Sequence, residues 1–326
     1  MTKKALVTGG AGFIGSHLCE SLIKKGYRVI CLDNLFSGSL DNIQKLLGNQ
    51  NFEFVNEDVR NKDVIIDLVK KVDIIYHLAA VVGVAMVVNY PLEDISVNIE
   101  GTSNVAQAAA KNGKTKVVFT SSSEVYGKND AVPLKEDSTA SIFGPTTITR
   151  WAYGLTKSIG EHLLLGYAEN GLPVSILRYF NTYGPRGINK KYANVIPQFI
   201  NQALAGEDIT VHGNGKQIRC FTYIADTVRA TVAAGEKSNN QVINVGSDRQ
   251  TSIKRLALLV KKIANSKSKI SYIPKDKVFK KKFEDPVVRR PSIEKAKEHL
   301  GYIPKHTLER GLKKTVEWTR KQYFGK

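Results

Sequence analysis

Short apolar runs alternate with longer segments of mixed polarity along the first half of the chain. The mixed segments near 101–112 and 153–169 carry an apolar face, as amphipathic helices do. Strands and helices that alternate in this way are typical of a parallel sheet, so the pattern predicts a doubly wound α/β fold up to about Leu177. The apolar runs of strand length lie at 5–7, 27–32, 52–55, 74–80 and 116–120.

The second half of the chain is predicted to cross between two domains. Residues about 179–219 enter a smaller α/β lobe, and residues about 220–248 return to the sheet through the apolar run 242–246. Residues 249–326 then complete the smaller lobe. The larger domain is expected to contain 1–178 together with the returning segment.

A glycine turn follows the first apolar run directly. Gly9, Gly12 and Gly15 separate this strand from a helical segment that begins near Ser16. Glycines let the backbone approach a diphosphate while the helix amides point at it, so the turn predicts a dinucleotide site. The alternative is a plain tight turn between a strand and a helix. Asp33, at the end of the second strand, favours the first interpretation, because an acidic residue there can accept hydrogen bonds from an adenosine ribose and repels the 2′-phosphate of NADP.

Polar groups at two further places predict acid–base chemistry. Ser122 and Glu124 follow the strand that ends near Thr120, at the sheet edge where open α/β sheets bind ligands. Tyr153 and Lys157 lie four residues apart, which puts both on one face of a helix. An ammonium group beside a phenol favours the phenolate, so we expect Lys157 to lower the pKa of Tyr153 from its usual value near 10. The alternative is a solvated pair on a helix surface.

Composition places the chain among soluble intracellular proteins. It has 326 residues, of which 42% are hydrophobic, enough for a large core. The longest uncharged apolar stretch, 79–88, is too short to span a bilayer, and no secretory signal precedes the first strand. His77 is expected to pack within its strand, because no second ligand stands at metal-binding spacing, so no metal is predicted. The scattered cysteines indicate a reducing cytoplasm: Cys19, Cys31 and Cys220.

A formal net charge of +18 raises the alternative of nucleic-acid binding. The lysines of the second half are not interleaved with aromatic residues, and no nucleic-acid-binding motif accompanies them. We therefore expect a solvated basic surface that helps to steer a diphosphate ligand, and no nucleic-acid partner. These lysines are Lys261, Lys262, Lys267, Lys269, Lys275, Lys277 and Lys280 to Lys282.

Downstream motifs carry a resemblance to a known family. Residues 177–185 read Leu-Arg-Tyr-Phe-Asn-Thr-Tyr-Gly-Pro, similar to the R-x-F-N-x-Y-G-P signature of the extended short-chain dehydrogenase/reductases that act on nucleotide sugars. Segments 194–197, 213–226 and 284–293 are similar to the substrate-binding parts of the same enzymes. The glycine spacing G-x-x-G-x-x-G at residues 9–15 also resembles this family. Together these motifs extend the resemblance over essentially the whole chain. It implies a Rossmann fold with a smaller substrate lobe, NAD, a UDP-sugar substrate and a homodimer formed by two helices of each subunit.

The resemblance also implies residue roles. Ser122 is expected to hydrogen-bond the reacting sugar oxygen, Tyr153 to take its proton, and Lys157 to hold the nicotinamide ribose. The full catalytic set is Ser122, Ser123, Glu124, Tyr153, Lys157 and Arg289. The cofactor set is Gly9, Gly12, Phe13, Ile14, Gly15, Asp33, Asn34, Asp58, Val59, Leu78, Ala79, Ala80, Asn98, Ser121, Tyr153 and Lys157. The substrate set is Val82, Gly83, Ser122, Glu124, Arg150, Tyr179, Asn181, Asn194, Val195, Arg219 and Arg289, with Arg219 as the diphosphate ligand.

The resemblance leaves several reactions open, because all these enzymes first oxidise the sugar at C4. Glu124 distinguishes them, since simple 4-epimerases usually carry no carboxylate there. Ser122-Ser123-Glu124 is most similar to UDP-glucuronate decarboxylases, whose catalytic arginine corresponds to Arg289. Segment 81–91 instead resembles the substrate arm of epimerases. The sequence therefore favours a UDP-glucuronate decarboxylase, with a UDP-sugar 4-epimerase next, then a dehydratase, and a non-catalytic NAD-binding protein as the alternative of another class.

Overall fold

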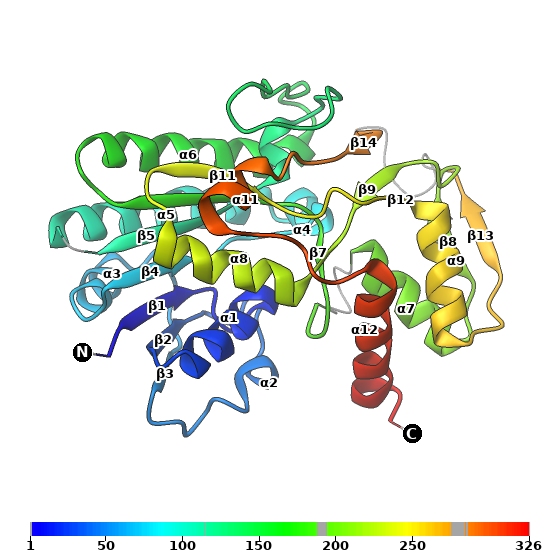
Figure 1. Cartoon of the computed structure of the whole chain (residues 1–326), viewed down its shortest axis with the longest axis horizontal. Coiled ribbons are helices and arrows are strands. Elements are labelled where there is room, and N and C mark those ends of the chain that lie inside the picture. The colour runs from blue at the N-terminus through cyan, green and yellow to red at the C-terminus, as the bar shows by residue number, and fades with distance from the viewer. Residues whose placement is uncertain (1, 114, 188–193, 275–283, 285, 326) are drawn as a thin grey trace.

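A computed structural model describes the chain apart from residues 1, 114, 188–193, 275–283, 285 and 326. Its main element is a seven-stranded sheet in which all neighbouring strands run parallel (Figure 1). The predicted doubly wound parallel sheet is confirmed, including the return of the chain through 242–246. In spatial order the strands are β11 (Gln241–Val245), β6 (Val174–Tyr179), β5 (Lys116–Ser122), β4 (Ile74–His77), β1 (Lys4–Thr8), β2 (Arg28–Leu32) and β3 (Phe52–Val55).

Helices cover both faces of this sheet and create two hydrophobic cores. Strand β1 shows why its sequence is continuously apolar: Ala5 and Val7 point into one core and Leu6 into the other, and all three are fully buried. The first core is closed by α1 (Phe13–Lys24) and α8 (Ile224–Lys237). The second is closed by α3 (Lys62–Val69), α5 (Pro91–Asn112) and α6 (Ala152–Glu169).

Helix α5 begins ten residues before the amphipathic segment that predicted it. Pro91 opens the helix, where a residue without an amide hydrogen is tolerated. Its N-terminal turns and its middle bury the polar residues Asp94, Asn98 and Thr102, which are spaced four apart on one face. An apolar periodicity cannot detect a helical face of this kind.

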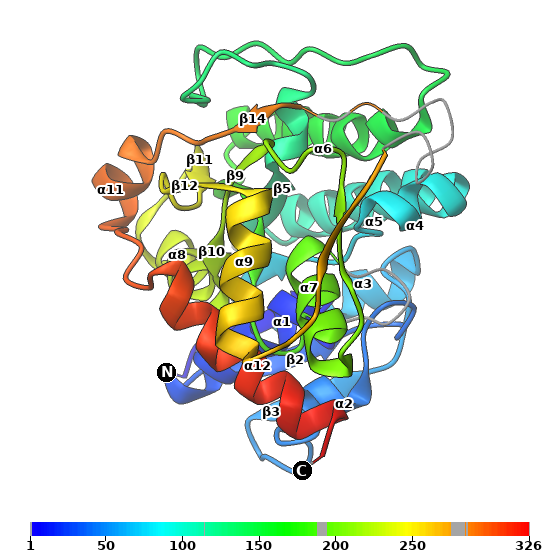
Figure 2. The ribbon, with the colours of Figure 1, turned by 90° about the vertical axis from the view of Figure 1, so that its right-hand side faces the viewer.

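The rest of the chain forms smaller sheets and helices. Figure 2 shows α7 (Val195–Ala205), α9 (Ile253–Ala264) and α12 (Leu308–Tyr323) packed together. The small sheets pair β7 (Thr182–Tyr183) with β10 (Thr222–Tyr223), β8 (Ile209–His212) with β13 (Ile270–Ile273), and β9 (Ile218–Cys220) with β12 (Gln250–Ser252) and β14 (Val288–Arg289). Short helices are α2 (Leu40–Ile43), α4 (Val84–Asn89), η1 (Ser123–Tyr126), η2 (Thr149–Trp151) and α11 (Glu294–Leu300). The proposed domain boundaries remain a prediction.

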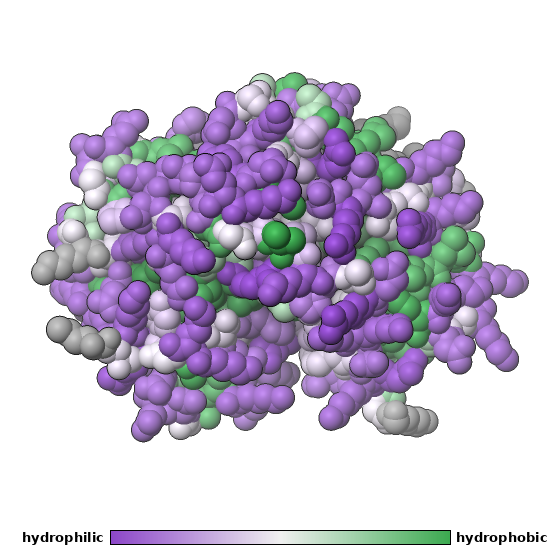
Figure 3. Space-filling model, in the orientation of Figure 1, coloured by the Kyte–Doolittle hydropathy of each residue, from purple (hydrophilic) through white to green (hydrophobic). Residues whose placement is uncertain are grey.

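The surface of the molecule is polar on the face that is drawn in Figure 3, which is covered mainly by hydrophilic residues. Lys275, Lys277 and Lys280 to Lys282 lie outside the described residues. Within the described part of the chain, no helix is long and apolar enough to cross a membrane. The three cysteines are buried and unpaired.

Gly15→Ala tests how closely the glycine turn packs. A Cβ at this position would lie 2.1 Å from the carbonyl oxygen of Gly9, which is backbone and cannot move aside without strain. We expect the free energy of unfolding to fall by about 1–3 kcal/mol or more in a denaturant titration. The control is Gly166→Ala in α6, where a Cβ meets nothing within 4 Å and helix propensity predicts a gain of up to about 1 kcal/mol. An undisturbed Gly15→Ala protein would contradict the packing described here.

Candidate active site

The glycine turn lies where the order of the sheet reverses. From β1 the chain proceeds to β2 and β3 on one side and later to β4, β5 and β6 on the other. Ligands of open α/β sheets bind at the carboxyl ends of strands at such a point. Gly9 has a φ of +69°, and a Cβ there would lie 2.8 Å from the amide nitrogen of Ala79, which follows β4. The two strand ends therefore meet only because this residue has no side chain.

This turn has the features of a diphosphate cradle. Gly12 is the N-cap of α1 and supplies no side-chain cap, and the first turn of α1 contains no acidic residue. The helix therefore presents its amides and the positive end of its dipole without competing groups. Phe13 and Ile14 start the helix and pack partly against the core. The residues present fit a dinucleotide diphosphate.

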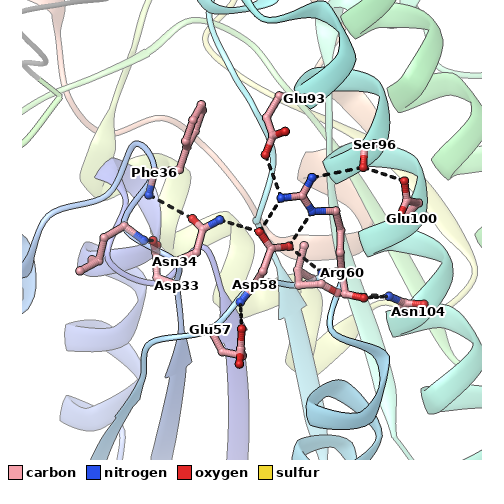
Figure 4. Close-up of polar contacts among 12 residues, drawn as sticks. Asp33, Asn34, Phe36, Glu57, Asp58, Arg60, Glu93, Ser96, Glu100 and Asn104 are labelled. Carbon is pink, nitrogen blue, oxygen red and sulfur yellow. Dashed lines mark hydrogen bonds and ion pairs between the residues drawn. The ribbon is translucent and has the colours of Figure 1, made fainter.

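Asp33 holds the loops on both sides of this cradle. Its Oδ2 accepts from the amide of Ala11 at 2.9 Å and its Oδ1 from that of Leu35 at 2.8 Å. Burial raises the pKa of Asp33, and these backbone hydrogen bonds oppose that rise. Because a carboxylate has about four acceptor positions, Asp33 keeps capacity for a ribose hydroxyl. Asn34, the next residue, donates to Oδ2 of Asp58 at 2.8 Å (Figure 4).

Two further residues of the predicted cofactor set, Asn98 and Ser121, also have their side chains hydrogen-bonded within the protein. The side chain of Asn98 accepts from the amide of Val81 at 3.1 Å and donates to Thr156 Oγ1 at 3.1 Å. Ser121 Oγ donates to the carboxylate of Glu161 on α6, which also pairs with Arg178. These side chains join secondary-structure elements, and their cofactor roles remain predictions. The others, Val59, Leu78, Ala79 and Ala80, lie in the loops after β3 and β4.

The predicted Ser122, Tyr153 and Lys157 come together at the end of β5 and the start of α6. Ser122 hydrogen-bonds Tyr153, and its Oγ accepts from the amide of Glu124 at 3.2 Å. The ammonium nitrogen of Lys157 lies 5.9 Å from the ring centre of Tyr153 and 4.7 Å from that of Phe119. The spacing of four residues thus predicted their common helix face correctly.

The expected lowering of the pKa of Tyr153 does not occur in this arrangement. Burial raises the pKa of the phenol, and the charges of Asp94 and Glu124 raise it further, whereas the Ser122 hydrogen bond lowers it. Burial also lowers the pKa of Lys157 to about 8. Desolvation and the nearby carboxylates, which the spacing of Tyr153 and Lys157 does not reveal, outweigh the attraction of one ammonium group.

Glu124 lies between two buried guanidinium groups. Its Oε2 is 3.1 Å from Nη1 of Arg150 and its Oε1 is 3.5 Å from Nη2 of Arg289. Burial alone would raise the pKa of Glu124, but the charges of Arg289, Arg150 and Arg219 outweigh it and lower that pKa. Arg289 also donates to the backbone oxygens of Ser123 at 2.5 Å and Gly127 at 3.0 Å. Glu124 is therefore an ionised carboxylate, 28% exposed, beside Ser122 and Tyr153.

The remaining predicted substrate residues lie on several elements. Arg219 on β9 pairs in register with Arg289 on β14 and donates to the carbonyl of Ile218 at 2.9 Å. Tyr179 ends β6, and its hydroxyl is 2.6 Å from Thr231 on α8. Asn181, exposed, follows β6, and Asn194 and Val195 begin α7. Val82 is exposed and Gly83 precedes α4.

Asp94 was missed by the sequence argument. It is fully buried, and its Oδ1 accepts from Asn98 Nδ2 at 2.6 Å. Within the described residues, its Oδ2 has no hydrogen-bond partner. Burial raises its pKa to about 6, and its charge raises the pKa of Lys157. No pattern in one sequence marks this residue, because an acidic side chain in a first helical turn is ordinarily exposed.

Comparison with known proteins assigns the family. Residues 5–246 match the NAD dependent epimerase/dehydratase family. The chain belongs to this family. It is 45% identical to a UDP-N-acetyl-alpha-D-glucosaminuronate decarboxylase of Bacillus cytotoxicus, over 98% of both chains. It is 36% identical to UDP-glucuronic acid decarboxylase 1 of Xenopus tropicalis, over 98% of this chain and 73% of the relative.

A solved structure supports the same assignment. The UDP-glucuronic acid 4-epimerase of Bacillus cereus, in complex with UDP-glucuronic acid and NAD, matches with a TM-score of 0.86 and 33% identity. The match covers 98% of this chain and 100% of that one. The family relationship predicted from the motifs is confirmed.

Asp94→Asn is expected to change how stability depends on pH. Asp94 has a pKa of about 6 in the folded protein, against an ordinary value of 3.8, so the folded protein binds more protons between these pH values and wild-type stability falls as pH rises through this window. The variant lacks this loss, so from pH 4 to pH 7 its free energy of unfolding should rise relative to wild type by up to about 3 kcal/mol. Denaturant titrations at both pH values measure this. The control is Asp67→Asn on α3, where the side chain is 69% exposed. A pH-independent difference would contradict the environment assigned to Asp94.

Proposed function

We propose that the protein binds NAD at the glycine turn and a UDP-sugar beside it. The uncapped start of α1, the close contact at Gly9 and the acceptor at Asp33 support the cofactor. The carboxylate of Asp33 favours NAD over NADP, because it would repel the 2′-phosphate. Arg219 and Asn181 are the proposed ligands of the substrate diphosphate, since a guanidinium matches phosphate oxygens.

The proposed reaction is the decarboxylation of a UDP-uronic acid, either UDP-glucuronate or its 2-acetamido counterpart. The observation that carries this proposal is the ionised Glu124 between Arg150 and Arg289 at the catalytic edge. A carboxylate substrate needs a cation, and the two arginines supply one next to Ser122 and Tyr153. The likeness to two decarboxylases over almost the whole chain supports the same reaction.

The residues then have the following proposed roles. Ser122 donates a hydrogen bond to the oxygen at C4, Tyr153 accepts its proton, and Lys157 binds the nicotinamide ribose. NAD would be held by the glycine turn, Asp33 and Lys157, and when bound it would supply reversible hydride transfer at C4 and a positive charge that favours the phenolate of Tyr153. The resulting 4-keto sugar has its carboxylate β to the ketone, so the C5–C6 bond breaks, carbon dioxide leaves, and the electron pair forms an enolate. In this proposal Glu124 and Arg289 order water and assist protonation at C5.

The second candidate function is a 4-epimerase. The similar Bacillus cereus protein is a 4-epimerase whose structure contains UDP-glucuronic acid, and one fold supports several reactions. Product masses distinguish the reactions. The purified protein is incubated with NAD and UDP-glucuronate, UDP-N-acetylglucosaminuronate, UDP-glucose or UDP-N-acetylglucosamine. A decarboxylase gives a product lighter by carbon dioxide from a uronate only. An isomer of unchanged mass establishes the epimerase, and loss of water a dehydratase.

Glu124→Gln is expected to stop a decarboxylase after its first step. The amide keeps the shape but loses the charge and the ability to relay a proton, so NADH and a 4-keto sugar should accumulate on the protein. NADH absorbance after mixing with the uronate measures this. In a simple 4-epimerase the same variant should show no steady-state NADH and a rate within a few-fold of wild type, and the decarboxylase proposal would then be abandoned.

A cytoplasmic location is proposed as well, because the three cysteines are free and disulfides are rare in that compartment.

We further propose that the protein forms a homodimer. Helices α5 and α6 pack side by side and expose several large apolar side chains outward: Leu92, Ile95, Leu155 and Ile159. Ile159→Glu should therefore halve the mass measured by light scattering. Leu258→Glu on α9, where the parent side chain is similarly exposed, should leave the mass unchanged. A wild-type monomer, or an unaffected Ile159→Glu protein, would contradict the dimer.

A further inference from the structure

A network of polar side chains joins the loops after β2 and β3 to the first turns of α5 (Figure 4). Arg60 is its centre. On one side its guanidinium donates bidentate hydrogen bonds to the carboxylate of Asp58, from Nε to Oδ1 at 2.9 Å and from Nη2 to Oδ2 at 2.8 Å. The amide of Arg60 also donates to Oδ1 of Asp58 at 2.8 Å. Asp58 is thereby fixed in one orientation.

On its other side, Arg60 is bound to α5. Nη2 contacts Oε1 of Glu93 at 2.8 Å, and Nη1 donates to Ser96 Oγ at 3.3 Å. Ser96 in turn donates to Glu100 at 2.6 Å, and Asn104 donates to the backbone carbonyl of Arg60 at 2.9 Å. The loop after β3 is therefore attached to α5 through both the side chain and the backbone of one residue.

Asp58 also connects this network to the loop that contains Asp33. Its Oδ2 accepts from Asn34, directly after Asp33. The hydrogen bond from Arg60 is the largest cause of the lowered pKa of Asp58, which keeps it an ionised acceptor. Next to it, Val59 is buried under α5, where a Cβ at Gly101 would lie 2.5 Å from its side chain. Arg60 thus controls the charge and position of the surface beside Asp33.

We propose that Arg60 is a positioning residue for the adenosine end of the cofactor. It holds Asp58 and Val59 against α5 so that the adenine meets a preformed acceptor and a preformed apolar surface. This inference rests on the proposed function, because it requires NAD to bind at the glycine turn. The side chains of Arg60, Asp58 and Glu93 are 29%, 22% and 32% exposed, so solvent screening makes these ion pairs weak contributors to stability. The main effect of these ion pairs is to fix the orientation of the Asp58 carboxylate.

The test compares ligand affinities in Arg60→Lys and Arg60→Gln. Lysine keeps the charge but lacks the planar fork, so both variants should bind NAD and AMP about tenfold more weakly. Affinity for UDP, a ligand of the other half of the site, should stay within twofold, and the unfolding temperature should change little. Glu93→Gln, which removes only one attachment to α5, should weaken AMP binding by a smaller factor. The matched control is Lys70→Gln, an exposed cation at the end of α3 that pairs with Asp67 of the same helix.

The outcomes separate three cases. Selective loss of NAD and AMP affinity supports the positioning role. Unchanged AMP affinity in Arg60→Lys, or an equal loss of AMP and UDP affinity with a lower unfolding temperature, overturns it, the latter because it indicates a general structural role. Absence of NAD and AMP binding by the wild-type protein refutes the proposed function itself.

Discussion

The carboxylate of Glu124 lies between two buried guanidinium groups, and the arrangement of the catalytic edge depends on this contact. Arg150 and Arg289 are only 6% and 2% exposed. Two buried cations so close together would repel each other strongly without an anion between them. Glu124 supplies that anion, and Arg289 in turn caps backbone oxygens of the segment that carries Glu124. Through this contact β14, late in the chain, is bound to the end of β5.

Buried polar side chains also link separate elements elsewhere around the site. Asp33 joins two loops through backbone amides, and Asn98 joins the loop after β4 to α6. His77 is buried between Thr8 and Thr102, where burial lowers its pKa to about 3 and keeps it neutral. Polar side chains therefore fix the relative positions of the strand ends, while the apolar cores hold the layers together.

The alternation of apolar runs predicted the sheet because its central strands are buried on both faces and are therefore largely apolar, as β1 and β4 are. The glycine turn, Asp33 and the pair Tyr153 and Lys157 were predictable because local spacing alone sets their geometry. The beginning of α5 and the role of Asp94 were not, since they depend on polar groups that meet across helices. The predicted direction of the pKa shift of Tyr153 was wrong for a related reason, because burial and the approach of carboxylates from other parts of the sequence arise only in the folded chain.

Everything proposed for the catalytic edge requires Glu124 to be an ionised carboxylate between Arg150 and Arg289. Infrared difference spectroscopy of wild-type protein minus Glu124→Gln tests it directly, because carboxylate and protonated carboxyl groups absorb at different frequencies. The account predicts carboxylate bands that persist as pH falls below the ordinary range for a glutamate, and that titrate at a higher pH in Arg150→Met. A protonated carboxyl band that disappears in Glu124→Gln at neutral pH would contradict the account.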